Sequence, residues 1–513
     1  YQDKLASLKF LDPACGSGNF LTETYLSLRR LENEVMPIIG DLFNPIKVDI
    51  HQFYGIEIND FAVATATTAL WIAEAQMMAE TERMLHIDLD FLPLKAYNNI
   101  REGNALRIDW NEVVPASELN YIMGNPPFVG HQNRTEEQIE DMEIAFQGFD
   151  TYGKLDYVSA WYKKAADYMQ GTTILAAFVS TNSIVQGESV DVMWEPLQNK
   201  RSVDITFAHK TFVWNSEAKE KAAVHCVIIG FCVFKYTGEK IIFNQSPTPQ
   251  KASNINGYLL DAPNIYIKGR SKLLNPGLPE MTKGSQATDG GNLFLSVEQR
   301  DELISKYPAA ATLIKQFVGA EEFINNKLRY CIWLKDVAPS HYRNIPPIIE
   351  RLEKVAEVRR KSPTKSVQKD AETPMLFTQI RQPETAYMIV PRHSSVNRRY
   401  IPFGYMAPDV ICGDANSMIP DASLSLFGIL ISNVHMAWMR VVCGRLKSDY
   451  RYSPSVYNNF PWPTPTESQK SKIEQTAQAI LDARAKYPDC SLADLYDELT
   501  MPVELRKAHQ END

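Results

Sequence analysis

Two short segments of this chain carry residue types and spacings that could do chemistry. Residues 125–128 read Asn-Pro-Pro-Phe and follow the apolar run at residues 121–123. Residues 12–18 read Asp-Pro-Ala-Cys-Gly-Ser-Gly and follow another short apolar run. The first segment fits a grip on a planar amino group that awaits alkylation. The second fits the turn that holds a nucleotide-like cofactor, so the two form a two-part signature.

The Asn-Pro-Pro-Phe segment can hold an exocyclic nitrogen without a metal or a strong base. The side-chain oxygen of Asn125 can accept one amino hydrogen, and the carbonyl of Pro126 can accept the other. The rings of Pro126 and Pro127 stiffen the turn that aims both acceptors. Phe128 offers a face on which a base could stack. Positioning of this kind can supply much of the acceleration of an in-line methyl transfer.

The elements around the glycine-containing segment at residues 12–18 predict a doubly wound α/β fold. Residues 9–11 are typical of a short buried strand, and helical spacing begins at residue 19. A strand, a glycine turn and a helix in this order place a ligand outside the carboxyl end of the strand. Gly16 and Gly18 permit a tight turn and a close approach of the ligand to the backbone.

The residues at three positions indicate which ligand the glycine turn binds. Leu21 stands where a dinucleotide fingerprint would have its third glycine, so a pyrophosphate is disfavoured. Glu57 ends a second strand at residues 52–56 and can accept both hydroxyls of a ribose. Asn104 follows a third strand and can read the amino group of an adenine. This combination describes S-adenosyl-L-methionine.

These two segments resemble the amino-methylating (adenine-N6) DNA methyltransferases, a family with a Rossmann-like class I methyltransferase fold. The resemblance implies that the glycine-containing segment holds the methionine part of S-adenosyl-L-methionine. The implied cofactor-binding residues are Asp12, Ala14, Gly16, Gly18, Phe20, Glu57, Ile58, Asn104 and Ala105. The implied catalytic residues are Asn125, Pro126, Pro127 and Phe128.

A target base inside a duplex must be flipped out before it can reach such a site, at a cost of a few kcal/mol. Aromatic stacking returns about 1–3 kcal/mol of that cost. Phe128 is one stacking surface, and the family places a second in a loop before a late strand. That loop is predicted at residues 210–215, with Trp214 favoured over Phe212 as the stacking residue.

Other substrates remain open at this point. Asn-Pro-Pro-Phe also occurs in relatives that methylate guanine N2 in ribosomal RNA or glutamine amides in release factors. A third reading is a binding module with a degenerate methyltransferase fold. The intact segment at residues 125–128, together with Glu57, disfavours the third reading. The second half of the chain must decide between the other two.

Bulk composition fits a soluble multidomain protein. The chain has 513 residues, too many for one core, and no apolar stretch approaches the ~20 residues that span a bilayer. Its seven cysteines form no CxxC pair, which favours the reduced thiols of a cytoplasmic protein. Residues 327–460 carry a net charge of +8, whereas the rest carries −17. A basic stripe on an acidic body suits a specific binder of double-stranded DNA.

Two loops in the basic half combine Arg, Ser and Asn with tyrosines. These side chains can bond to phosphates and to base edges, Arg chiefly to guanine and Asn to adenine. The predicted DNA-binding residues are Arg392, Ser394, Asn397, Arg398, Arg399, Arg445, Lys447 and Arg451. Between the amphipathic helix that begins at Pro346 and these loops, the run at residues 359–365 is predicted to be a mobile basic linker.

Residues 317–323 and 457–463 further resemble the MmeI-like type IIL/IIG fused restriction–modification enzymes. That resemblance implies a methyltransferase domain at residues 1–238, a mixed α+β target-recognition domain at 239–465 and a helical segment at 466–513. Helices are expected after Thr466 and across residues 492–505.

Two features of those enzymes are not seen in this sequence. Family members have an element ahead of the first strand that helps clasp the cofactor, and the chain begins at Tyr1, too late to include it. The fused enzymes also carry a metal-dependent nuclease at the amino end, so the resemblance allows a nuclease domain upstream in the parent chain. Glu217-Ala218-Lys219 is interpreted as part of a lid and not as nuclease residues, and no metal site is predicted. We therefore expect this chain to methylate and not to cut.

Overall fold

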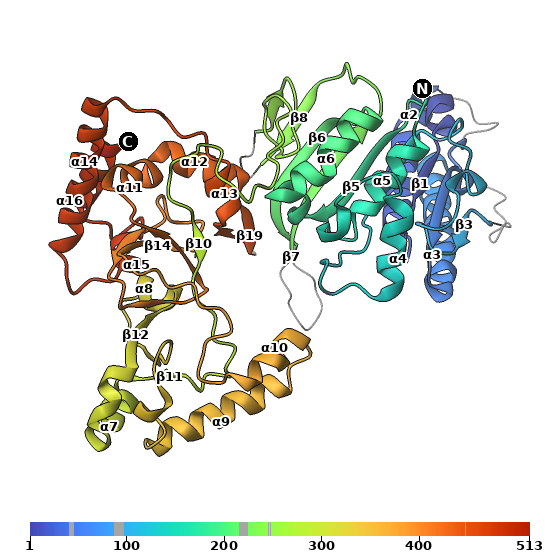
Figure 1. Cartoon of the computed structure of the whole chain (residues 1–513). Coiled ribbons are helices and arrows are strands. Elements are labelled where there is room, and N and C mark those ends of the chain that lie inside the picture. The colour runs from blue at the N-terminus through green and yellow to red at the C-terminus, as the bar shows by residue number, and fades with distance from the viewer. Residues whose placement is uncertain (40–45, 87–96, 215–223, 245, 247, 447) are drawn as a thin grey trace. The chain divides into compact units, whose positions relative to one another are not determined.

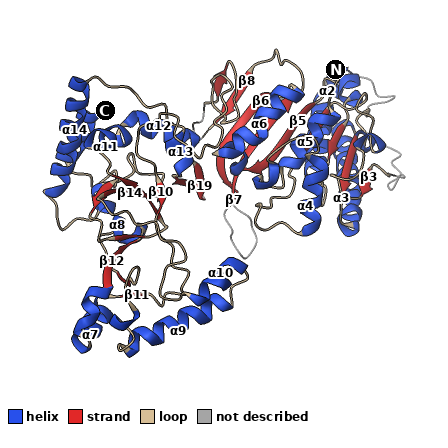
Figure 2. Ribbon diagram, viewed as in Figure 1, coloured by secondary structure: helices blue, strands red, loops and turns tan. Residues whose placement is uncertain are grey.

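The computed structural model describes residues 1–39, 46–86, 97–214, 224–244, 246, 248–446 and 448–513. The chain divides into two compact units, Tyr1–Lys268 and Gly269–Asp513. Figure 1 follows the chain from its N-terminus to its C-terminus, and Figure 2 separates helices from strands. Each unit has sheets and hydrophobic clusters of its own.

The first unit contains a nine-stranded sheet in the order β3-β2-β1-β4-β5-β7-β6-β8-β9. The strands are β1 (Phe10–Asp12), β2 (Phe53–Glu57), β3 (Ile100–Glu102), β4 (Tyr121–Gly124), β5 (Leu175–Thr181), β6 (Asp204–Trp214), β7 (Val224–Cys232), β8 (Lys240–Phe243) and β9 (Gln250–Ala252). Strands β1 to β5 are parallel, and β7 runs antiparallel between β5 and β6. The order reverses between β1 and β4, where open α/β sheets bind their ligands.

Helices cover both faces of this sheet, as Figure 1 shows, which confirms the α/β class. They are α1 (Gln2–Ser7), α2 (Asn19–Ile39), α3 (Asp60–Leu85), α4 (Glu136–Ala145), α5 (Ser159–Tyr168) and α6 (Glu188–Arg201). Phe10 packs with Leu21 and Leu70 on one face, whereas its neighbour Leu11 packs with Trp161 on the other. The alternation of side chains along β1 therefore splits the core into two layers.

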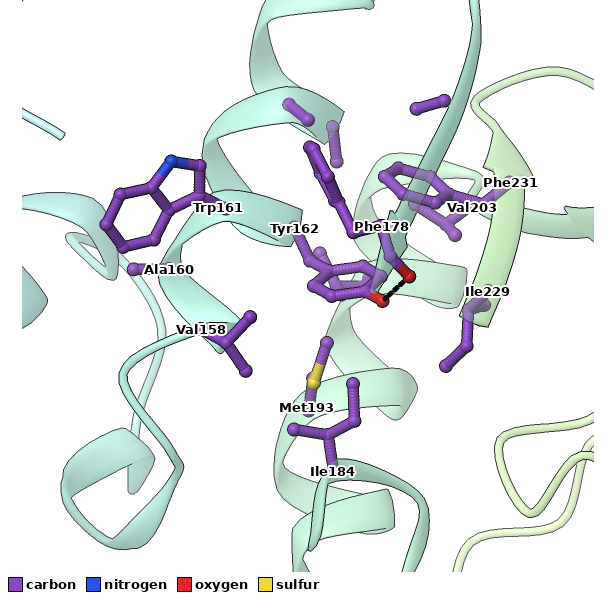
Figure 3. Packing of buried hydrophobic residues seen from close by; sticks show 14 of the residues in the cluster. Val158, Ala160, Trp161, Tyr162, Phe178, Ile184, Met193, Val203, Ile229 and Phe231 are labelled. Carbon is purple, nitrogen blue, oxygen red and sulfur yellow. Dashed lines mark hydrogen bonds between the residues drawn. The ribbon is translucent and has the colours of Figure 1, made fainter. Parts of the chain in front are cut away.

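The larger core layer is closed by aromatic packing between α5 and the sheet. The ring of Tyr162 lies 5.3 Å from that of Phe178 and 5.2 Å from that of Phe231, centroid to centroid (Figure 3). Its hydroxyl is paired with the Ser180 hydroxyl at 2.7 Å, so the polar end of this buried ring is satisfied. This packing fixes α5 against β5 and β7.

The second unit is built from three small sheets and a set of helices. The sheets are β10-β18-β14-β16, β11-β13-β12-β17 and β15-β20-β19. Their strands are β10 (Thr282–Lys283), β11 (Phe294–Leu295), β12 (Ile314–Val318), β13 (Tyr330–Ile332), β14 (Tyr387–Pro391), β15 (His393–Ser394), β16 (Gly404–Met406), β17 (Ile411–Cys412), β18 (Asn416–Pro420), β19 (Gly444–Leu446) and β20 (Asp449–Arg451). The helices are α7 (Val297–Lys306), α8 (Ala320–Ile324), α9 (Pro346–Arg360), α10 (Lys365–Lys369), α11 (Leu424–Ile431), α12 (Asn433–Val442), α13 (Pro454–Asn458), α14 (Glu467–Ala485), α15 (Leu492–Leu495) and α16 (Val503–Asn512).

Helix α9 begins at Pro346, as the sequence predicts, but the prediction of a mobile linker after it is wrong. Arg359 is fully buried, and the chain continues into the short helix α10. Its guanidinium donates hydrogen bonds to the main-chain oxygens of Ala287, Thr288, Asp370, Thr373 and Leu376. The five N–H groups of this arginine thus bind main-chain oxygens on two separate segments, residues 287–288 and 370–376. The charge therefore fastens this part of the fold.

The C-terminal helices agree with the sequence in part. Helix α14 starts after Thr466, whose side chain forms a capping box with Gln469. Residues 492–505 were expected to form one helix, but they contribute to two, α15 and α16. Among the residues that the structure describes, no single helix is long and apolar enough to cross a membrane; the bent pair α11 and α12 meets that criterion only when taken together.

Candidate active site

The glycine-containing turn after β1 is shaped by two glycines with positive φ. Gly16 has φ of 53° and Gly18 has φ of 82°. A Cβ at Gly18 would lie 3.0 Å from the Cβ of Ala66 in α3, so a larger residue would push the turn off that helix. At Gly16 a Cβ would meet no atom within 4 Å. The backbone is therefore open to a ligand at Gly16.

Glu57 ties the end of β2 to this turn. One carboxylate oxygen accepts the Gly16 N–H at 2.9 Å, and the other accepts the Asn59 N–H at 3.0 Å. Each oxygen keeps a further lone pair, so the side chain can still accept hydroxyl groups of a ligand. Ile58 beside it is 67% exposed, which leaves an apolar side chain facing outward at the same edge.

The two sequence segments meet through Gly124, the residue before Asn125. Strand β4 lies directly beside β1, and the two are parallel, so their carboxyl ends share one edge of the sheet. A Cβ on Gly124 would collide with the carboxylate of Asp12. Only glycine allows this approach, which brings the start of the Asn-Pro-Pro-Phe turn against the start of the glycine turn. This glycine belongs to neither of the two predicted segments, although its place immediately before Asn125 is a usable signal.

Asp12 is a buried carboxylate with one oxygen left over. Its Oδ1 accepts the Ala14 N–H at 3.0 Å, whereas Oδ2 is buried with no hydrogen-bond partner among the described residues. Burial raises the pKa of Asp12 to about 7, and the nearby Glu57 adds to the rise, although the Ala14 bond opposes it. A buried acceptor without a donor is costly, so this oxygen fits a ligand that brings a donor or a positive charge.

The Asn-Pro-Pro-Phe turn projects from this edge. Asn125 and Pro127 are exposed, Pro126 is buried, and Phe128 is half-buried against the larger core cluster. The next residue, Val129, is held on both sides: its N–H donates to Asp156 at 3.2 Å and its carbonyl accepts the Tyr157 N–H at 3.0 Å. The turn is thus anchored before Asn125 by the Gly124 contact and after Phe128 by the segment that leads into α5.

Asp156 acts as the far anchor and was not assigned this role from the sequence. Its Oδ1 also accepts the Val158 N–H at 3.2 Å, so one carboxylate joins the turn to the start of α5. Burial raises its pKa, while the bonds from Val158, Val129 and Thr181 work against that rise. An Asp just before a helix is a common cap, which is the signal that was available.

Asn104 is more engaged than the sequence suggests. Its Oδ1 accepts the Leu106 N–H and its Nδ2 donates to Asp141, both at 2.9 Å. Asp141, a buried residue of α4, also accepts from Arg107 and Tyr157 at 2.6 Å. Burial alone would raise the pKa of Asp141, but these hydrogen bonds hold it below the usual value. Its place within a polar helical sequence gave no sign of this role.

The other predicted cofactor residues lie along the same edge. Phe20 is half-buried in the first turn of α2, and Ala105 is buried after β3, with its carbonyl accepting the Trp110 indole N–H at 2.9 Å. Within the described ranges, no group of three His, Cys, Asp or Glu side chains is placed to hold a metal ion. The residues Glu217, Ala218 and Lys219 lie outside the described part of the chain.

Comparison with known proteins gives matches along the whole chain. Residues 1–244 match the model of the MmeI DNA-methyltransferase domain, residues 261–464 the MmeI target recognition domain, and residues 465–513 the MmeI C-terminal domain. The solved structure of the type IIL restriction-modification enzyme MmeI in complex with DNA is 44% identical, with a TM-score of 0.95, and the match covers 100% of this chain and 70% of that one. The chain belongs to the MmeI family.

Curated relatives of this MmeI-family chain are longer than it is. DNA methyltransferase A of Bacillus subtilis is 40% identical over 99% of the chain, which spans 58% of that protein's length. The adenine-specific methyltransferase PglX of Streptomyces coelicolor is 38% identical over 13% of the chain and 5% of its own length.

The late aromatic segment of this MmeI-family chain differs from its prediction. Residues 210–214 were expected in a loop, but they form the end of strand β6, where Trp214 pairs with Val224 beyond a register shift between His209 and Phe212. Trp214 is 42% exposed, whereas Phe212 is half-buried with its ring 4.9 Å from that of His209. Pairing of residues 212–214 with residues 224–226 of β7 places the predicted loop in the sheet. Residues 215–223 lie outside the described ranges.

The two predicted DNA-binding loops come together in the target recognition part. Strand β15 pairs with β20, which sets His393 opposite Arg451 and Ser394 opposite Tyr450. Arg445 on β19 lies over the Tyr450 ring, 4.3 Å from its centroid. One of the predicted residues, Lys447, lies outside the described residues.

The predicted loop residues differ in their exposure. Asn397 and Arg399 are exposed, Arg392 and Arg398 are half-buried, and Ser394 is buried with its hydroxyl unpartnered among the described residues. Burial lowers the pKa of Arg398. The exposed members can reach a partner directly, whereas Ser394 faces into the fold.

Proposed function

We propose that this chain is a site-specific DNA methyltransferase that transfers a methyl group from S-adenosyl-L-methionine to N6 of an adenine flipped out of double-stranded DNA. We further propose that it is the modification part of a restriction–modification or phage-defence system. Residues 1–238 carry the transfer, residues 239–465 recognise the target, and residues 466–513 form a helical C-terminal segment.

The cofactor site is assigned to the edge formed by β1, β2 and β3. The unpartnered Oδ2 of Asp12 and the open backbone at Gly16 fit a ligand with a cationic methionine part. Glu57 accepts the ribose hydroxyls with its free lone pairs. When bound, the cofactor supplies an electrophilic methyl group on sulfur. The full proposed set is Asp12, Ala14, Gly16, Gly18, Phe20, Glu57, Ile58, Asn104 and Ala105.

The transfer itself is assigned to the turn after β4. The Asn125 amide oxygen and the Pro126 carbonyl each accept one hydrogen of the adenine amino group, which draws the nitrogen lone pair out of the ring. Pro127 keeps the turn rigid. The base stacks on Phe128, with Trp214 as its second wall. N6 takes the methyl group as the bond from that group to the cofactor sulfur breaks, with the bonding electrons left on sulfur, and the amino nitrogen releases one proton to water, so no strong base is needed.

The observation that carries this proposal is the contact of Gly124 with Asp12, which joins the amino-gripping turn to the cofactor turn at the strand-order reversal. The family match of the second half to a target recognition domain favours DNA over a ribosomal or release-factor substrate. The DNA complex reported for the related MmeI supports the same choice.

The test is methyl transfer with isotopically labelled S-adenosyl-L-methionine and genomic DNA, followed by nucleoside analysis. We expect label in N6-methyladenine, confined to one short sequence motif. Label in 2-methylguanine of RNA or in glutamine of a protein acceptor would replace the proposed substrate. Cofactor binding without transfer to any acceptor would support the degenerate binding module instead.

A further inference from the structure

Four cationic side chains gather on one part of the second unit, and two of them were not singled out in the sequence. We call Lys283, Arg381, Arg392 and Arg451 the basic cluster. Lys283 on β10 pairs with Ser417 of β18, and the other side of Ser417 pairs with Val390 of β14. Lys283 and the end of β14, which leads into Arg392, therefore both lie beside β18.

Short-range contacts fix the remaining members around Lys283. Arg381 donates from Nη1 to the carbonyl of Gly284, the residue next to Lys283, at 3.2 Å. Arg392 directly follows the last residue of β14, Pro391, and it is the largest cause of the lowered pKa of Lys283, so these two cations lie close together. The carbonyl of Arg392 in turn accepts the Tyr452 N–H at 2.8 Å, which ties the cluster to Arg451.

No member of the basic cluster has a carboxylate within 4.0 Å in the part of the chain that the structure describes. Other cations of the same unit are paired: Lys306 with Glu302, Lys354 with Glu350 and Lys361 with Glu357, at 2.6–2.7 Å. The guanidinium of Arg392 instead donates to the main-chain oxygen of Asp414 at 2.7 Å. That bond orients the group without neutralising it.

Repulsion between the like charges of the basic cluster costs electrostatic free energy. The pKa of Lys283 is lowered chiefly by Arg392, then by burial and by Arg381 and Arg451, while Asp414 opposes the shift. The pKa of Arg392 is lowered by burial and by Arg451. Unpaired like charges that repel one another are relieved by a bound anion, so the cluster fits an anionic partner.

We propose that the basic cluster binds a backbone phosphate of duplex DNA and sets the position of the target-recognition part on it. This inference rests on the proposed function, because it takes DNA as the partner. Arg381 and Arg392 each spend an N–H group on a carbonyl of their own chain, and Lys283 is a point charge without a planar fork. Such groups suit a phosphate better than a base edge, so the contact positions the protein and does not read sequence.

The test is a salt series with Lys283→Gln in the 513-residue chain, binding a duplex of unrelated sequence. Each lost phosphate contact should make the slope of log affinity against log salt shallower by about 0.9. We expect that change for Lys283→Gln and for Arg381→Gln, with equal loss on a duplex that the chain methylates. Lys354→Gln is the matched control, because Lys354 is an exposed, carboxylate-paired lysine of the same unit; its slope should equal that of the wild type.

Measurement of the unfolding midpoint tests whether Lys283→Gln is correctly folded. Because Lys283 is repelled by its neighbours, Lys283→Gln should leave the unfolding midpoint at low salt unchanged or slightly higher, so weaker binding cannot be blamed on a damaged fold. A Lys283→Gln slope equal to the wild-type slope would overturn the inference, and so would a loss confined to one DNA sequence. Wild-type chain that transfers no methyl group to DNA would defeat the proposed function instead, which separates the two failures.

Discussion

At the scale of single residues, the chemistry depends on where Asn125 is held. Its side chain is exposed at the sheet edge and makes no hydrogen bond to a described residue, so its proposed acceptor role exists only while an amino group is in place. Asn125→Ala should therefore lower methyl transfer by about 10²- to 10³-fold, the usual loss when one such hydrogen bond to a transition state is removed. Binding of duplex DNA and of the cofactor should change little.

The measurement for Asn125 is single-turnover transfer of labelled methyl groups, with duplex affinity measured in parallel. Asn199→Ala is the control, since Asn199 is an exposed amide on α6 whose side chain donates a hydrogen bond to Glu195. Transfer by Asn125→Ala at the wild-type rate would remove this residue from the proposed mechanism.

Asp12 makes cofactor affinity depend on pH. Burial raises its pKa to about 7, so in the empty site it holds a proton below neutrality, whereas a cationic ligand next to Oδ2 favours the ionised form. Binding must then release that proton, and affinity should rise about fivefold from pH 6 to pH 7 before levelling off. Calorimetric titration of S-adenosyl-L-methionine at several pH values measures this.

The control for that pH effect is Asp12→Asn, which removes the ionisation and should give a flat profile over the same range. The folding stability of the cofactor-free chain should depend on pH in the opposite direction to cofactor affinity. A carboxyl with a raised pKa stabilises the fold below its ordinary pKa of about 4, and that stability is lost as pH rises toward 7. Cofactor affinity that falls with rising pH in the wild type would contradict the placement of a cation beside Asp12.

The chemical roles of single residues could be predicted from the sequence, but the residues that they contact could not. The roles proposed for Asp12, Glu57 and Asn125 follow from motifs with fixed spacing along the chain. The contact between Gly124 and Asp12, by contrast, exists only because β4 lies beside β1, and local sequence does not predict the order of strands in a sheet. Asp141 and Asp156 escaped notice for the same reason, since their donors come from distant segments.

At the scale of elements, the Asn-Pro-Pro-Phe turn is rigid only if its far end is fastened to α5. Asp156 does this by accepting the N–H groups of Val129 and Val158. Asp156→Ala should lower the rate of transfer about tenfold, because two backbone donors lose their acceptor and the turn loosens. Asp156→Asn keeps an acceptor oxygen and should recover most of the rate.

For this element, the rate constant and the substrate KM are to be measured separately. A positioning role lowers kcat and leaves cofactor affinity unchanged. Asp150→Ala provides the matched control, because Asp150 is an exposed carboxylate six residues earlier in the same connection. If Asp156→Ala and Asp156→Asn lose the rate equally, charge rather than fastening is responsible.

Regular elements with strong patterns were predictable, whereas segments set by tertiary partners were not. The helix from Pro346 and the helix capped by Thr466 carry their own start signals. The run at Arg359 looked like an exposed basic linker, because its five carbonyl acceptors lie on other segments. The end of β6 looked like a loop, because its pairing with β7 includes register shifts that no local pattern announces.

At the scale of the whole molecule, the chain consists of two compact units with separate cores. Units with separate cores need not unfold together. We expect urea unfolding to show two transitions, and a ligand bound to one unit should shift only that unit's transition. S-adenosyl-L-methionine at a hundred times its Kd should stabilise the first unit by about 2.7 kcal/mol.

Substitution of Arg359 should shift the unfolding transition of the second unit without shifting that of the first. Arg359→Ala removes five hydrogen bonds made by a fully buried guanidinium and should cost the second unit at least about 3 kcal/mol, while the neighbouring and exposed Arg360→Ala should cost almost nothing. Because the cofactor is proposed to bind only the first unit, its stabilising effect should be the same in Arg359→Ala as in the wild type. Fluorescence and circular dichroism followed across the same urea series would resolve the two steps. A single transition that responds to both the cofactor and Arg359→Ala would mean that the units are energetically one, and the separate assignment of transfer and recognition to them would lose its physical basis.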